Sequence, residues 1–265
     1  MSPLQRILKI AAHHETVWNL MSNTVIRAAD SLRFYREGYE QERRRAALVN
    51  DAIVRICPDL TVRNGPFKGM RYPSAESSGS VLFPKLLGSY ERELHPVIEQ
   101  MQQYRDIHDV GCAEGYYLIG LGMLNRNAVL TGYDTNPRAR DLCMKMATLN
   151  GVDARLSVKE WCDGQFTFPY GGGLIVCDVE GYEAQLFTKD IDADVLIEIH
   201  DAKDASIRTK VEAAFRGRRI EFIPAIPDAD KPDANFRELG DYSREQQTIL
   251  LAEERSRSTG WLWIQ

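Results

Sequence analysis

The stretch Asp109–Gly115, DVGCAEG in one-letter code, decides the fold expected of this 265-residue chain. The apolar run in front of it predicts a short buried strand over residues 107–110, and the apolar run behind it predicts a helix over residues 116–124. Small residues between a strand and a helix let the backbone turn tightly and approach a ligand closely. A glycine-rich turn by itself is weak evidence for a particular ligand. The residues around it are therefore needed to identify what it binds.

The alternation of strand and helix continues after this turn. Strands are expected over residues 128–133, 154–158, 173–177, 195–199, 219–223 and 261–264, and helices over 137–150, from 185 and over 205–215. Such alternation predicts an α/β fold, a mostly parallel sheet with helices on both faces. Ligands of these sheets bind outside the carboxyl ends of the strands, where the strand order reverses.

The chain in front of this sheet has a different pattern. Residues 1–58 are predicted to form a helical extension that ends at Pro58, followed by a main domain over residues 59–265. The apolar face of the extension has three candidate partners: the main domain, a second copy of the chain in a homodimer, or a membrane surface; packing against protein is favoured. Two short strands over 60–63 and 67–72, and a helix from Ser89 to about residue 104, are expected next.

The region before the last strand is expected to be a loop. Residues 224–245 are rich in Pro, Asp and Lys, and long loops of this kind often cover a substrate site. A helix is expected over residues 243–254, before the last strand at 261–264.

Composition excludes several classes of protein. The 33 basic and 38 acidic residues give a net charge of −5, which argues against a general nucleic-acid binder. The five cysteines are scattered singly, so neither a disulfide framework nor a cysteine zinc site is expected. No apolar run approaches the ~20 residues of a membrane span, and the first 21 residues lack the apolar core of a signal peptide. A cytoplasmic protein without a membrane span is therefore expected.

A second acidic residue indicates what the glycine turn binds. Asp134 ends the next strand, where a carboxylate can accept hydrogen bonds from both hydroxyls of a ribose. The glycines lack the spacing of a pyrophosphate site, and Glu114 would place a negative charge beside any phosphate. S-adenosylmethionine carries a sulfonium and an ammonium instead, so it suits an acidic pocket better than a dinucleotide does.

These segments resemble a known family. Asp109–Gly115 and Tyr133–Pro137 are similar to the first two signature segments of class I S-adenosylmethionine-dependent methyltransferases. Asp178–Glu183 and Ile197–His200 resemble the D-x-E-G-x-E and E-x-H segments of the FkbM-type members, and Gly88–Glu91 resembles a segment in front of their first strand. The resemblance covers about residues 60–200 and departs from the usual pattern at Ala113, where many members have glycine.

The resemblance implies a Rossmann-like methyltransferase sheet with an antiparallel last strand and S-adenosylmethionine as cofactor. Asp109, Gly111 and Gly115 would line its methionine end, together with Ala113 and with Cys112, which is otherwise expected to be a small packing residue. Asp134 would hold the ribose, with Thr135 and Asn136 nearby. Trp161 either stacks on the adenine or is a core aromatic, and Tyr90 and Glu91 either close over the cofactor or begin a helix.

Methyl transfer to a hydroxyl also needs a base. The candidates at the ends of the fourth and fifth strands are Asp178, Glu180, Glu198 and His200; Glu198 and His200 lie two apart and therefore share a face of their strand. His200 is either this base or a structural histidine, and Glu183 is expected to cap or orient the helix that follows it. Asp178, Glu180, His200 and Asp201 form a set that suits Mg²⁺, although carboxylates held by hydrogen bonds or by the cofactor are favoured over a metal.

The sequence thus predicts a methyltransferase acting on a hydroxyl of a sugar, glycan or secondary metabolite. One alternative is an NAD(P)-dependent oxidoreductase, which Glu114, the glycine spacing and the lack of a suitably placed Tyr-x-x-x-Lys pair disfavour. The other is a non-catalytic scaffold that binds the cofactor.

Overall fold

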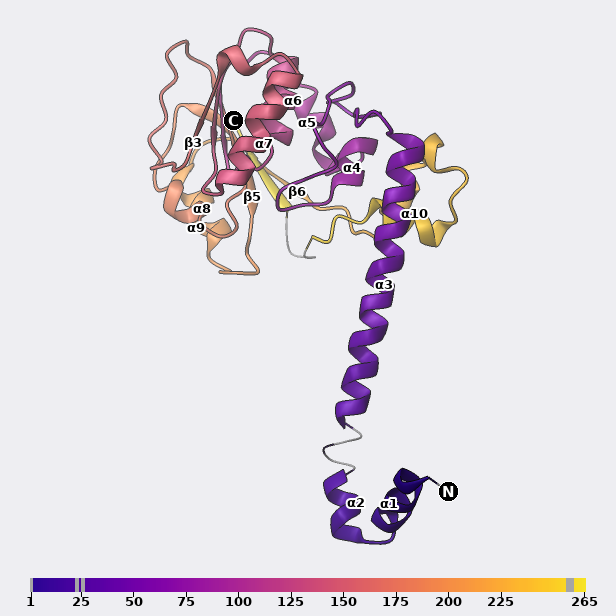
Figure 1. The fold of residues 1–265 in the computed structure, drawn as a ribbon. Coiled ribbons are helices and arrows are strands. Elements are labelled where there is room, and N and C mark those ends of the chain that lie inside the picture. The colour runs from indigo at the N-terminus through magenta and orange to yellow at the C-terminus, as the bar shows by residue number, and fades with distance from the viewer. Residues whose placement is uncertain (1, 22–23, 25–26, 256–259) are drawn as a thin grey trace. The chain divides into compact units, whose positions relative to one another are not determined.

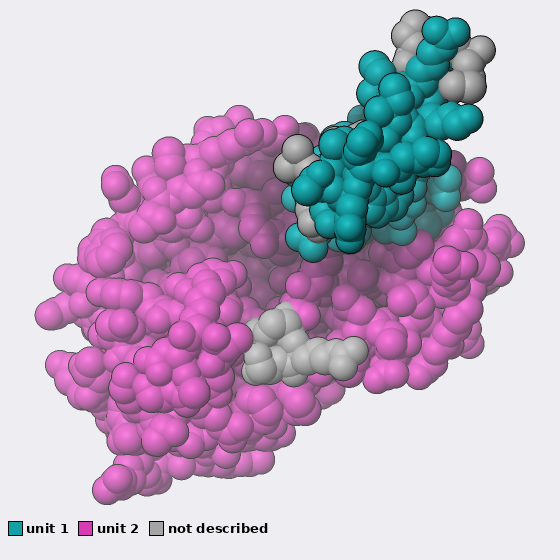
Figure 2. All heavy atoms as spheres, turned by 90° about the horizontal axis from the view of Figure 1, so that it is seen from below, with its two compact units in different colours: residues 1–50 teal, residues 51–265 magenta. Residues whose placement is uncertain are grey.

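A computed structural model describes residues 2–21, 24, 27–255 and 260–265 of the chain. The chain divides into two compact units, residues 1–50 and residues 51–265 (Figure 2). No helix in the described part is long and apolar enough to cross a membrane.

The first unit is helical, as expected. It contains α1 (Pro3–Ala12), α2 (Glu15–Met21) and most of α3 (Arg27–Ile56), whose last turns belong to the second unit. Helix α1 begins with a capping box in which the side chain of Ser2 accepts the backbone N–H of Gln5, and the side chain of Gln5 accepts that of Ser2. The expectation of helix at residues 1, 22–23 and 25–26 lies outside the described residues.

The second unit is built on one seven-stranded sheet (Figure 1). The strands are β1 (Asp106–Val110), β2 (Val129–Tyr133), β3 (Leu156–Lys159), β4 (Gly173–Cys177), β5 (Ala193–Ile199), β6 (Ile220–Pro224) and β7 (Gly260–Ile264). Their order is β3-β2-β1-β4-β5-β7-β6, and all pairs are parallel except those that β7 makes with β5 and β6. This confirms the predicted sheet and places its switch point between β1 and β4.

The helices of this unit cover both faces of the sheet. They are α4 (Leu82–Leu87), α5 (His95–Ile98), α6 (Tyr116–Leu124), α7 (Pro137–Leu149), α8 (Glu183–Leu186), α9 (Ile207–Ala214) and α10 (Arg244–Leu251). Alternate residues of β4 belong to two separate hydrophobic clusters: Leu174 and Val176 pack with α6 and α7, whereas Ile175 and Cys177 pack with α8 and α9. The unit is therefore a three-layer sandwich whose strand ends remain open for a ligand.

The expected hairpin at residues 60–72 forms only in part. Thr61 and Arg71 make an isolated antiparallel bridge, and neither flank is a strand. The side chains of Val62, Phe67 and Met70 instead pack into the core beside the sheet. The apolar residues of this segment are therefore spaced for packing against the core, and not for a continuous two-stranded hairpin.

The prediction of a helix from Ser89 to about residue 104 is wrong. Glu91 adopts a left-handed backbone with φ 44°, which no helix can continue through. A 3₁₀ turn (Arg92–Leu94) and the single turn of α5 follow it, whereas the longer helix α4 lies just upstream. The 224–245 region is irregular as expected, apart from 3₁₀ turns at Lys231–Ala234 and Arg237–Leu239, and α10 forms close to its expected place.

Candidate active site

The DVGCAEG turn is packed between the ends of β2 and β4. The backbone N–H groups of Gly111 and Cys112 both donate to the carbonyl of Tyr133, at 2.8 and 3.0 Å. Gly111 has φ +84°, and a Cβ built there would lie 1.7 Å from the carbonyl oxygen of Asp178. Glycine is therefore required here by the close approach of the chain's own backbone, a cause that the sequence analysis attributed to a ligand.

A polar cavity of about 470 Å³ opens in front of this turn. It lies at the carboxyl ends of β1, β4 and β5, the switch point at which ligands of such sheets bind. Among the predicted site residues, it is lined by Tyr90, Glu91, Asp109, Gly111, Cys112, Ala113, Asp134, Asn136, Asp178, Glu180, Glu198 and His200.

A second, mainly apolar cavity of about 360 Å³ adjoins the first. Trp161, Cys162, Val179, Tyr182 and Leu186 provide its apolar walls, and Thr135 lies at its edge. Trp161 is 58% exposed, so the core interpretation of this residue is wrong. Its ring centroid lies 5.9 Å from that of Tyr182 at an interplanar angle of 57°, leaving an aromatic face open to a planar ligand.

Asp134 stands where the two cavities meet. Both cavities share Gly111, Asp134, Asp178 and Glu180, so together they form one cleft with an apolar and an acidic half. One oxygen of Asp134 accepts the N–H of Ala113 at 2.9 Å, and the other accepts the N–H of Asn136 at 2.8 Å. These bonds orient the carboxylate and leave each oxygen a further lone pair for a ligand hydroxyl.

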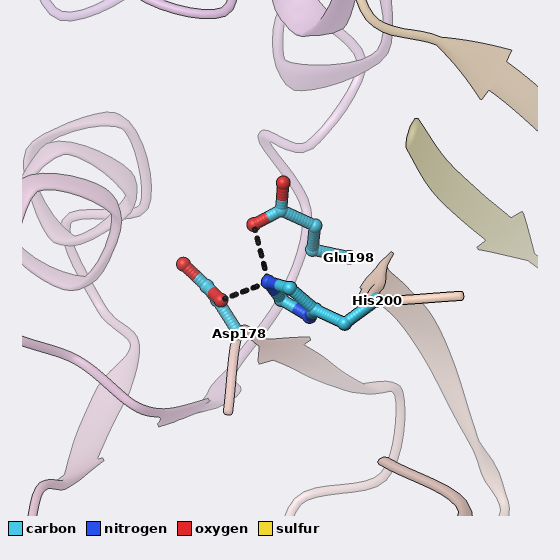
Figure 3. A group of neighbouring side chains, drawn as sticks. All are labelled: Asp178, Glu198 and His200. Atoms are coloured by element: carbon cyan, nitrogen blue, oxygen red, sulfur yellow. Dashed lines mark ion pairs between the residues drawn. The ribbon is translucent and has the colours of Figure 1, made fainter. Parts of the chain in front are cut away.

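His200 follows β5 and is oriented by a buried carboxylate. Its Nδ1 lies 2.5 Å from Oε1 of Glu183, and the N–H of Gly181 donates to the same oxygen at 3.0 Å. Its Nε2 faces three further carboxylates: Asp178 at 3.6 Å, Glu180 at 3.7 Å and Glu198 at 3.7 Å. Figure 3 shows Asp178 and Glu198 converging on this one nitrogen. Glu183 therefore orients the imidazole, a role that the sequence analysis missed.

The electrostatics of His200 follow from these neighbours. Burial by itself lowers the pKa of His200, but the hydrogen bond with Glu183 and the charges of Glu198 and Glu180 outweigh it and raise the pKa above its usual value. Lys203 hydrogen-bonds Glu180 at 2.6 Å and lowers the pKa of that carboxyl. Burial, together with the neighbouring charge of Glu198, raises the pKa of Asp178 well above its usual range.

Arg255 links three acidic residues on the other side of the cavity. It contacts Glu198 at 2.6 Å, Glu93 at 2.6 Å and Glu91 at 3.4 Å. Burial raises the pKa of Glu91 to about 8 although Arg255 lowers it. Glu91 does stand at the N-cap of the 3₁₀ turn that follows, as the helix-start interpretation expects, but its side chain makes no capping bond and accepts the hydroxyl of Tyr117 instead.

The donor set for a metal differs from the predicted one. Ligand atoms of Asp178, Glu198 and His200 lie within 4.8 Å of one another, a mixed carboxylate and imidazole set that suits a hard divalent cation. Two members of the predicted set are not part of it: Glu180 pairs with Lys203 at 2.6 Å, and the carboxylate of Asp201 accepts the N–H of Arg208 at 3.1 Å. One oxygen of Glu198 already accepts a hydrogen bond from Arg255. The guanidinium of Arg255 therefore supplies part of the positive charge that a bound cation would bring.

Glu114 does not act as the sequence analysis expected. Its side chain is fully buried and forms an ion pair of 2.5 Å with the buried Lys85, which lowers the pKa of Glu114 against the effect of burial. It also accepts the hydroxyl of Ser77 at 2.8 Å and the N–H of Ser78 at 3.0 Å. Glu114 therefore holds the 77–80 loop at the cavity rim, and its charge is neutralised before it can repel a phosphate.

Two predicted cofactor residues have packing roles. Gly115 lines neither cavity, and a Cβ there would lie 2.8 Å from Sγ of Cys143. Cys112 lines the acidic half, but its contact with Cys143 and its burial raise the pKa of its thiol, so it is a packing residue and not a nucleophile. Several lining residues belong to no motif and were not predicted: Lys85, Tyr116, Tyr117, Lys203, Glu253 and Arg255.

No family model and no curated protein sequence matches the chain. Distant likenesses occur among solved structures. The O-methyltransferase region of StiE, residues 942–1257, is 16% identical with a TM-score of 0.42 over 82% of this chain and 88% of that one. A ribosomal protein L11 methylase from Lactobacillus delbrueckii subsp. bulgaricus is 14% identical with a TM-score of 0.45 over 74% and 84%.

A third likeness is an S-adenosylmethionine-dependent methyltransferase from Geobacter sulfurreducens, solved with S-adenosylhomocysteine. It is 16% identical with a TM-score of 0.41 over 65% of this chain and 89% of that one. Similarities this distant assign neither a family nor an activity, so function has to follow from the cleft itself.

Proposed function

We propose that the chain is an S-adenosylmethionine-dependent methyltransferase, with residues 59–265 as its catalytic domain. The observation that carries this proposal is the two-part cleft, in which Asp134 stands between an aromatic, apolar half and an acidic half. S-adenosylmethionine has the same division: a planar apolar adenine, a ribose with two hydroxyls, and a methionine end that carries a sulfonium.

Each part of the cofactor has a matching set of residues. The adenine would lie against Trp161 and Tyr182, and the ribose hydroxyls would donate to Asp134. The methionine end would extend past Gly111 toward the acidic half, where Asp109 and Glu91 lie. Burial raises the pKa of both carboxyls, and the positive charges of the bound cofactor would favour their ionised forms. A dinucleotide would bring its pyrophosphate into the same acidic half, where the lowered pKa of Glu180 keeps that carboxylate charged, so Glu180 argues against NAD even though Glu114 does not.

The acceptor is proposed to be a hydroxyl. Its oxygen would attack the methyl carbon in line with the breaking carbon–sulfur bond, and the electron pair of that bond would pass to sulfur, giving S-adenosylhomocysteine. The hydroxyl proton would pass to Nε2 of His200, the imidazole nitrogen that lines the cavity and has no hydrogen bond in the structure. Glu183 fixes the proton on Nδ1 and stabilises the imidazolium that forms.

Asp178 and Glu180 border the same space and would accept hydrogen bonds from other hydroxyls of the acceptor. A polyhydroxylated molecule such as a sugar, a glycan or a hydroxylated secondary metabolite therefore suits this cleft, and the FkbM-type assignment of the D-x-E-G-x-E and E-x-H segments is part of the same proposal. A divalent cation bound to Asp178, Glu198 and His200 would supply Lewis-acid activation of the hydroxyl. The proton transfer to His200 does not require it.

Calorimetric titration with S-adenosylmethionine, S-adenosylhomocysteine and NAD in parallel tests the cofactor. We expect micromolar binding of the first two, lost in Asp134→Ala and kept in Asp141→Ala, a matched acidic residue of α7 outside both halves of the cleft. Binding of NAD alone would favour an oxidoreductase. Binding of S-adenosylmethionine without transfer to any acceptor would favour a non-catalytic scaffold.

A further inference from the structure

Most of the large apolar side chains that the structure describes in residues 2–50 of the first unit are exposed. Ala11 is the one buried residue among the side chains described in residues 2–50. Large apolar side chains of this unit are between 42% and 72% exposed at Ile7, Leu8, Ile10, Val17, Trp18, Leu32, Phe34, Tyr35 and Tyr39. Uncovered apolar surface of this extent marks an interaction site and not a self-sufficient fold.

Helix α1 divides this surface into an apolar and a basic side. At 100° per residue, Ile7, Leu8, Ile10 and Ala11 cover one side, and Gln5, Arg6 and Lys9 the other. Helix α2, which contacts α1, adds the exposed Val17 and Trp18. Tryptophan and aliphatic residues opposite basic ones are typical of helices that lie in the plane of a membrane surface.

Charge distinguishes two of the candidate partners, a second copy of the chain and a membrane surface. The first 50 residues carry eight basic and five acidic side chains, whereas the remaining 215 carry 25 and 33. A second copy would bring the same basic excess to the contact, so the charges would repel. An anionic surface complements it.

We propose that α1 and α2 bind the surface of a bilayer that contains anionic phospholipid, with Ile7, Leu8, Ile10, Val17 and Trp18 inserted at the headgroup level. Arg6 and Lys9 hold the anionic headgroups. The helices lie on the membrane and do not span it, since α1 has only ten residues. This inference rests on the first unit alone and is independent of the proposed methyl transfer.

Vesicle flotation of the full chain tests the proposal. We expect the protein to float with vesicles of phosphatidylcholine and phosphatidylglycerol, to float far less with phosphatidylcholine alone, and to be released by high salt. Arg6→Gln with Lys9→Gln should weaken binding by roughly five-fold for each charge removed. Ile7→Asp with Ile10→Asp should abolish binding, whereas Met144→Asp, a control at an exposed apolar residue of α7, should leave it unchanged.

Three results would overturn the proposal. Equal binding to both kinds of vesicle would remove the role of charge, and binding that survives the change at Ile7 and Ile10 would place the contact elsewhere. Failure to float, together with a dimer in light scattering that the same change disrupts, would assign the surface to a second copy. Thermal unfolding of each variant shows that the main domain is intact, so that loss of flotation is not loss of fold.

Discussion

The imidazole of His200 is held at 2.5 Å by the carboxylate of Glu183, a side chain with no solvent exposure. This contact fixes which nitrogen of the ring carries the proton and turns Nε2 toward the cleft. It makes Glu183 a positioning residue, which lines neither half of the cleft and acts through His200.

Glu183→Gln should lower kcat by roughly ten- to a hundred-fold with little change in the KM for the acceptor, because the change removes the group that orients the base. Removing the carboxylate also removes one cause of the raised pKa of His200, so the rising limb of the pH–rate profile should move to lower pH. The matched control is Glu99→Gln, at an exposed carboxylate remote from the cleft. A fall in kcat with an unchanged pH profile would indicate a merely structural role.

The apolar half of the cleft makes a prediction about affinity. Trp161→Ala should weaken S-adenosylhomocysteine binding by roughly ten-fold, as expected for loss of one aromatic contact to a base. Tyr170→Ala is the control, because Tyr170 is an aromatic side chain of equal exposure, 58%, outside both halves of the cleft. Calorimetry measures both variants, and equal affinities would exclude Trp161 from the adenine site.

The raised pKa of Glu91 should make the stability of the fold depend on pH. Burial raises its pKa in the fold to about 8, above the ordinary value near 4.3 that applies in the unfolded chain. Between these values the folded state binds more protons than the unfolded state, so the contribution of Glu91 to stability falls as pH rises from about 4.3 to 8. Glu91→Gln should flatten this fall in urea unfolding measured across the range, and a slope equal to that of the wild type would contradict the burial argument.

The Lys85–Glu114 pair predicts a large stability effect. Lys85→Met should cost about 3–5 kcal/mol of unfolding free energy, since it leaves a fully buried carboxylate without its cation. Adding Glu114→Gln to the same chain should recover most of the loss. Urea unfolding of the two single variants and the double variant measures this recovery. If the two effects simply added, the double variant would be less stable than either single variant.

The metal-free mechanism makes its own prediction. Methyl transfer should persist after treatment with a chelator, because Arg255 and Lys203 already place positive charge beside Glu198 and Glu180. Activity measured with and without EDTA, and after addition of Mg²⁺ or Mn²⁺, checks this. Activity that vanishes with EDTA and returns with one of these ions would assign Asp178, Glu198 and His200 to a metal centre.

The sheet and the glycine turn were predictable because their signals are local. Apolar runs of strand length alternate with helical periodicity, and Asp109 and Asp134 lie within one residue of the carboxyl ends of the neighbouring strands β1 and β2. The end of β5 was predictable for the same reason, since Glu198 and His200 lie two apart and face the same space.

What sequence reasoning missed depends on contacts between distant segments. Arg255 lies 57 residues from Glu198, and no local pattern indicates that they pair. The left-handed turn at Glu91 interrupts an otherwise helical pattern, and its carboxylate meets Tyr117 across the core. Glu114 was misjudged because its partner, Lys85, lies in a helix that the sequence pattern did not predict.

A crystal structure with S-adenosylhomocysteine tests the central claim most directly. We predict the adenine against Trp161, the ribose hydroxyls on Asp134, and the sulfur in the acidic half with Nε2 of His200 open beside it. A ligand bound elsewhere, or bound with its ribose away from Asp134, would contradict the proposed active site.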